Sequence, residues 1–96
     1  MRALFIVLEN IHDPAGFDEY RSLVMPTLAP FGGKFLVRGG RFTVVEGNWP
    51  HERVAIVEFP SRAKAEEWYA SPAYQAILPL RLKSMTSSGI IVDAVG

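Results

Sequence analysis

Two charged residues, Arg38 and Glu58, lie inside stretches that are otherwise apolar and are suited to binding an anion or moving a proton. The planar guanidinium of Arg38 can bind a carboxylate or an enolate, and Glu58 can orient it or act as a base. A hairpin that turns at residues 47–50 brings the two together if Gly39-Gly40 shifts the register by one residue. Glu46 is a second carboxylate for Arg38. A structural ion pair, or two charges exposed at a sheet edge, is the commoner role for such residues.

Four aromatic residues and one arginine occupy helical faces and are the next candidates. Tyr20, Trp68, Tyr69 and Tyr74 recur at helical spacing, where an aromatic stripe usually belongs to the core. Tyr20 and Trp68 can also line a cavity between helix and sheet, because ligand pockets combine apolar walls with a few polar groups. Arg81 is either a surface residue with a buried stem or an anion contact.

The sequence lacks the residues or motifs that several classes of site require, among them metal centres, nucleophilic serines and phosphate-binding loops. There is no cysteine, and the two histidines, His12 and His51, fall in predicted loops without metal-ligand spacing. Ser61 and Ser71 are typical helix caps, with no nucleophile elbow around them. The glycine pairs do not form a phosphate-binding loop. We therefore expect neither a metal nor another cofactor.

Charge and composition restrict the partners. The ten basic and ten acidic residues cancel, which disfavours nucleic acid and anionic membranes. The first apolar run has the length of a strand and resembles neither a signal peptide nor a membrane-spanning helix. We expect a single domain over residues 1–96 in a cytoplasmic protein.

The elements that position these residues follow from periodicity and turn signals. Four strands and two helical regions are predicted: strands at 3–8, at 34–46 with a bulge at Gly39-Gly40, at 53–59 and at 87–95, and helices at 14–31 and, in two segments, after Ser61 and Ser71. Pro26 should kink the first helix or end it near Met25. The order β-α-β-β-α-β is that of an α+β, ferredoxin-like fold, whose antiparallel sheet has the strand order 4-1-3-2.

Both faces of that sheet are apolar. Residues 4–7, 54–57 and 90–92 are continuous apolar runs, whereas an open antiparallel sheet normally alternates apolar and polar residues. Two helical layers cover only one face. The second face needs another cover, and a second copy of the same sheet would supply it, which predicts a homodimer.

Five separated segments carry a resemblance to a known family. They are FGGKFLVRGG (31–40), EGNW (46–49), VEFPS (57–61), WYASPAY (68–74) and LR (80–81). Together they resemble the domain of unknown function 1330. The resemblance implies the dimeric α/β-barrel superfamily, which contains cofactor-free monooxygenases, isomerases and proteins without an assigned activity. It implies fold and dimerisation more than chemistry.

The sequence thus predicts a homodimer that binds a small organic molecule in or beside the barrel. A carboxylate on that molecule would be bound by Arg38. Cofactor-independent isomerase or oxygenase-like chemistry is one use of such a site. A non-catalytic dimerisation or binding module is the alternative. A cavity lined by Arg38 or Tyr20 would favour the first function, and a solidly packed interior the second.

Overall fold

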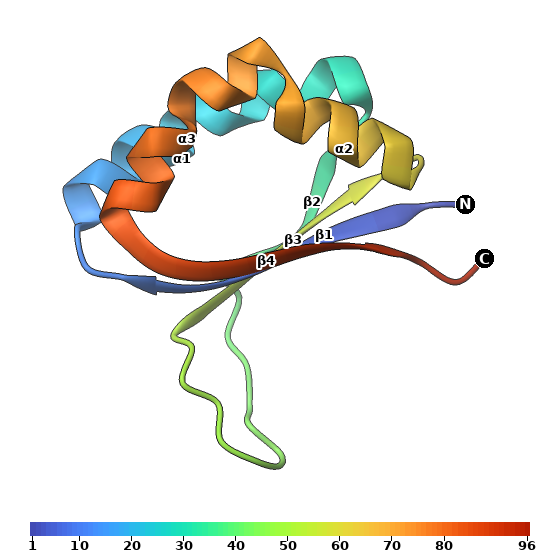
Figure 1. Ribbon diagram of the computed structural model, residues 1–96. Helices are drawn as coiled ribbons and strands as arrows, with labels where there is room; N and C mark the ends of the chain where they lie inside the picture. Colours follow the sequence, from blue (N-terminus) through green and yellow to red (C-terminus); the bar gives the residue numbers. More distant parts are fainter.

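A computed structural model describes residues 1–96, in which four strands and three α-helices follow one another (Figure 1). They are β1 (Ala3–Ile11), α1 (Pro14–Leu28), β2 (Lys34–Arg38), β3 (Arg53–Phe59), α2 (Arg62–Ala70), α3 (Pro72–Ser84) and β4 (Met85–Asp93), with a 3₁₀ turn, η1 (Ala29–Phe31), after α1. This order confirms the predicted α+β, ferredoxin-like fold, with α2 and α3 as the two segments of the second helical region. No helix has the length and apolar character needed to span a membrane.

The strands form one antiparallel sheet in the order β2-β3-β1-β4, which confirms the predicted arrangement. All three α-helices lie on the same face of this sheet (Figure 1). The helices begin where the sequence indicates, because Asp13, Ser61 and Ser71 each accept a hydrogen bond from the backbone N–H three residues later, at 3.1–3.3 Å. Outside β2, three strand ends differ from the prediction: β1 runs on to Ile11, and β4 begins at Met85 and ends at Asp93.

The first helix does not end near Met25. It continues through Pro26 to Leu28, although proline cannot donate the helical hydrogen bond at its position. The last turn is held by packing, because Thr27 and Leu28 are buried and Thr27 accepts a hydrogen bond from the indole of Trp68 at 3.0 Å. Tertiary contacts therefore outweigh the bond that is lost at Pro26.

The prediction of a strand over residues 42–46 is wrong. Residues 39–52 contain neither helix nor strand, and Figure 1 shows them as a long arm that leaves the sheet on the side away from the helices. Gly39 adopts a positive φ of 73°, favourable for glycine, and donates the last hydrogen bond to Val54 O at 2.9 Å. The irregularity in the β2–β3 ladder lies between Phe35 and Val37, not at the glycine pair.

The register decides which face of the sheet each side chain occupies. On β1, Ala3, Phe5 and Val7 face the helices and are buried, as are Ala55, Val57 and Phe59 on β3. The alternate residues Leu4, Ile6, Val54 and Ile56 face the other side, where Ile90 and Val92 of β4 remain 58% and 39% exposed. We call this uncovered apolar surface the open face.

Candidate ligand-binding site

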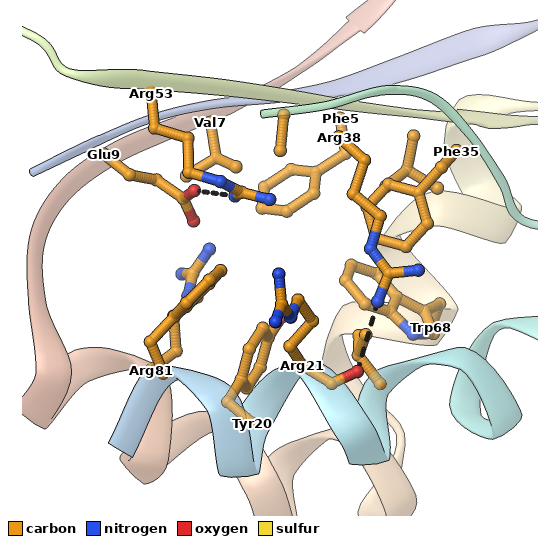
Figure 2. A pocket seen from close by; sticks show the side chains of 14 residues that line it. Phe5, Val7, Glu9, Tyr20, Arg21, Phe35, Arg38, Arg53, Trp68 and Arg81 are labelled. Carbon is orange, nitrogen blue, oxygen red and sulfur yellow. Dashed lines mark hydrogen bonds and ion pairs between the residues drawn. The ribbon is translucent and has the colours of Figure 1, made fainter. Parts of the chain in front are cut away.

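A narrow cavity that opens to solvent lies between the helix-facing side of the sheet and the helices (Figure 2). Aromatic rings make up much of its wall: Phe5, Phe17, Tyr20, Phe35 and Trp68. Its charged residues are four arginines and one glutamate: Arg21, Arg38, Arg53, Arg81 and Glu9. The whole chain has no net charge, so this excess of arginine makes the cavity locally positive.

Arg81 is the most unusual of the four arginines because it is buried without a counter-ion. It lies in the last turn of α3, is only 5% exposed, and its Nε and Nη1 have no hydrogen-bond partner. Its guanidinium carbon stands 5.7 Å from the centre of the Phe5 ring. A buried cation with free donors is costly unless a partner binds it, so Arg81 is suited to hold an anion.

Glu9 and Arg53 form an ion pair in the same wall. They are directly opposite each other on β1 and β3, and Arg53 Nη1 donates to Glu9 Oε1. Glu9 is 2% exposed, and the Arg53 guanidinium also lies 4.7 Å from the centre of the Phe17 ring. The pair brings a fixed carboxylate to the cavity at little net charge.

Arg38 and Arg21 stand at the mouth. Arg38 lies over the Phe35 ring at 4.6 Å, and its Nη2 donates to the backbone oxygen of Arg21 at 3.2 Å. Arg21 in turn bonds to the exposed Asp18 at 3.1 Å. Figure 2 shows both guanidinium groups directed into the space between helix and sheet, where they would meet an entering anion.

Two tyrosines form the polar part of the helix layer. The hydroxyl groups of Tyr20 and Tyr74 lie 2.9 Å apart and share a hydrogen bond. Burial raises the pKa of Tyr20 far above its ordinary value, and burial also raises the pKa of Tyr74. Both phenols are therefore neutral at physiological pH, and Tyr20 presents an uncharged hydroxyl-bearing ring to the cavity.

A comparison with protein families matches residues 2–95 to the domain of unknown function DUF1330. The chain belongs to this family. A search of curated proteins finds no match.

Solved structures similar to this DUF1330 chain share its fold. The protein of unknown function RPA0582 from Rhodopseudomonas palustris has a TM-score of 0.78 and 21% identity over 99% of this chain and 83% of its own. A dimeric ferredoxin-like protein from Jannaschia sp. CCS1 has a TM-score of 0.73 and 12% identity, over 98% and 100% of the two chains. SnoaB from Streptomyces nogalater, described as a cofactor-independent oxygenase, has a TM-score of 0.70 and 18% identity, over 99% and 94%.

The structure brings together four of the six residues that the sequence singled out. Arg38, Tyr20, Trp68 and Arg81 all line the cavity, although it lies on the helix side of the sheet and not in a barrel interior. Trp68 is almost fully buried and contributes only to the wall.

The two glutamates singled out by the sequence lie elsewhere in this DUF1330 chain. Glu58 pairs in register with Lys34, whereas Arg38, beyond the strand irregularity, pairs with Ala55. The predicted pairing of Arg38 with Glu58 is therefore wrong. Glu58 instead forms ion pairs with Arg2 and Lys34, and the hydrogen bond from Arg2 lowers its pKa. Glu46 is exposed on the arm, away from the cavity lining.

Sequence analysis missed Glu9 and Arg53, which complete the charged wall. The alternation along the first strand could have identified Glu9, which continues the series Ala3, Phe5, Val7 of helix-facing residues. The predicted strand ended at Leu8 and therefore left Glu9 out. Likewise, Arg53 lies two residues before the buried Ala55. No three His, Cys, Asp or Glu side chains gather in a group that could hold a metal ion.

Proposed function

We propose that this protein binds a small organic anion, such as an aromatic carboxylate, in the cavity between its sheet and helices. Arg81 carries the proposal, because Nε and Nη1 of this buried guanidinium have no partner within the chain. A ligand carboxylate that accepts from one of these donors would supply a missing hydrogen bond and the missing negative charge.

The rest of the lining supports an aromatic ligand. Rings of Phe5, Phe17, Tyr20 and Phe35 border the cavity, and ligand pockets combine such apolar walls with a few polar groups. Arg38 and Arg21 at the mouth would attract an anion from solution.

The same site suits cofactor-independent isomerase or oxygenase-like chemistry. SnoaB, whose fold is similar, is described as a cofactor-independent oxygenase, which supports this proposal by analogy of fold. The arrangement of a carboxylate and an unpaired guanidinium in one apolar cavity provides polar groups for such a reaction.

Calorimetric titration with phenylacetate, which combines a carboxylate with an aromatic ring, tests the binding site. Arg81→Met should lower the affinity at least about tenfold, because a charge-assisted hydrogen bond and the positive charge that faces the ligand are lost. Its melting temperature should equal or exceed that of the wild type, since an unpaired buried charge is removed.

Arg41→Met is the matched control, because Arg41 is exposed on the arm and should leave affinity unchanged. Native mass spectrometry of the freshly purified protein provides a second measurement, in which a retained organic acid is expected. Equal phenylacetate affinities of the wild type and Arg81→Met would contradict the proposed site, and so would absence of binding together with absence of a retained molecule.

We also propose that two copies pair through their open faces. Three of the solved structures with a similar fold are described as dimeric. The half-buried Ile6 and Ile56 and the exposed Ile90 lie side by side in the sheet register and form the centre of this apolar surface. A second sheet would remove it from water.

A further inference from the structure

The wall of the cavity places a carboxylate opposite an unpaired cation. Arg53 donates to Oε1 of Glu9, and no residue of the chain donates to Oε2. Figure 2 shows the Glu9 carboxylate and the Arg81 guanidinium facing each other across the cavity, with no bond drawn between them. Their nitrogen and oxygen atoms do not approach to within ion-pair distance, so the acceptor and the donors border the same cavity without satisfying each other.

This arrangement has the two parts that proton abstraction from carbon requires. A base must reach the hydrogen on the carbon beside a carbonyl group, and a fixed cation must stabilise the negative charge that develops on the carbonyl oxygen. Glu9 is held by Arg53 on a strand, and Arg81 is fixed in a helix against Phe5, so both groups are positioned before a ligand arrives.

We infer that the protein enolises a small 2-oxo acid with an aromatic or similarly apolar substituent, with Glu9 as the catalytic base and Arg81 holding the developing enolate. This inference rests on the proposed anion site and adds the reaction and the substrate class. In a 2-oxo acid the ketone oxygen would take the place at Arg81 that the carboxylate of a simple acid occupies. The carboxylate of the substrate would then lie towards the arginines at the mouth, and its apolar group against the aromatic wall.

The reaction balances without another reactant. Oε2 of Glu9 takes the proton from the carbon next to the ketone, the electron pair of the C–H bond forms the C=C bond, and the carbonyl π pair moves to oxygen. The enolate oxygen accepts a hydrogen bond from one of the free donors of Arg81. Return of the proton from Glu9 to the oxygen gives the enol, and its return to carbon restores the ketone. The net change is an isomerisation.

Exchange of the methylene protons of phenylpyruvate in D₂O, followed by proton NMR, tests the inference with the full chain. The wild type should exchange them faster than buffer alone. Glu9→Gln should lower the catalysed rate by about 100-fold or more, because an amide cannot accept the proton, while phenylacetate binding persists. Glu66→Gln is the control, since Glu66 is exposed on α2 and should keep the full rate.

A second variant covers the case in which Glu9→Gln fails to fold beside the now unpaired Arg53. Glu9→Asp keeps the charge and draws the carboxylate back by one methylene, so we expect at least a tenfold slower exchange from a folded protein. Two results would overturn the inference while leaving the anion site intact. The wild type could bind phenylacetate yet exchange the protons of phenylpyruvate no faster than buffer, or the wild type and the Glu9 variants could exchange them at equal rates. Failure of phenylacetate to bind would count against the proposed anion site instead.

Discussion

At the scale of single residues, the cavity separates charged groups that have partners from one that has none. Glu9 and Arg53 satisfy each other within the sheet, whereas Arg81 is buried as deeply and keeps two free donors. Tyr20 and Tyr74, packed edge to face at 6.3 Å between ring centres, satisfy each other without charge. The unpaired guanidinium is therefore the group through which a ligand would gain most.

The buried tyrosine pair makes the free energy of unfolding decrease at alkaline pH. The pKa values of Tyr20 and Tyr74 are raised by burial in the folded state, so above about pH 10 the unfolded chain releases protons that the folded chain retains. The unfolding free energy should be constant near pH 8 and fall as pH rises past 10, by up to about 1.4 kcal/mol per pH unit for each tyrosine.

Urea unfolding at pH 8 and at several pH values above 10 measures how the unfolding free energy changes with pH. Tyr20→Phe should make the slope shallower, and at pH 8 it should cost about 1 kcal/mol because Tyr74 loses its partner. A slope identical to that of the wild type would show that Tyr20 does not carry the effect.

At the scale of elements, packing overrides local preference in α1 and turn chemistry ends β2. Pro26 lies in the exposed part of α1, while its neighbours Thr27 and Leu28 hold the last turn in the core. The arm of residues 39–52 returns to the sheet through Asn10, which donates to Pro50 O and accepts from the Glu52 backbone N–H, both at 2.7 Å. Side-chain hydrogen bonds here replace the hairpin ladder that the sequence suggested.

Pro26→Ala tests how much stability the proline costs the helix at this position. Alanine restores a backbone donor inside a continuous helix and removes the ring from an exposed site, so the unfolding free energy should rise by about 1–3 kcal/mol. Urea denaturation measures the change. Ala63→Gly, at an exposed position of α2, should lower the unfolding free energy by about 1 kcal/mol. A less stable Pro26→Ala would show that this turn depends on the proline itself.

At the scale of the whole molecule, the sheet separates two surfaces with different roles. The helix-facing side holds the core and the cavity, and the open face presents aliphatic side chains for which the chain itself has no cover. Burying each such side chain is worth about 1.5–3 kcal/mol, so several of them would couple folding to pairing of two copies.

Ile56→Glu tests the pairing at the centre of the open face. The register places Ile56 between Ile6 and Val37, so a buried charge there should cost several kcal/mol and yield unfolded or aggregated chain and not a stable monomer. Sedimentation velocity and melting at several protein concentrations measure the effect, and Ala63→Glu on the exposed face of α2 is the control. A wild-type melt that does not depend on concentration, from a monodisperse monomer, would refute the dimer.

The sequence by itself determined the strand order, the helix caps at Asp13, Ser61 and Ser71 and the apolar character of both sheet faces. Each of these depends on local backbone chemistry or on a periodicity that repeats along one element. The sequence also pointed to Arg38, Tyr20 and Arg81, since polar groups inside apolar patterns are visible without a fold.

Only the tertiary structure decided which of these groups meet. Lys34, and not Arg38, lies opposite Glu58, and the irregularity between Phe35 and Val37 turns Arg38 to the helix-facing side of the sheet. The extension of β1 brings Glu9 opposite Arg53. The structure also decided that Ile56 and not Val57 faces outward. A change of one residue in register reverses the face of every side chain beyond it, and the free energies that fix the register come from packing between elements far apart in the sequence.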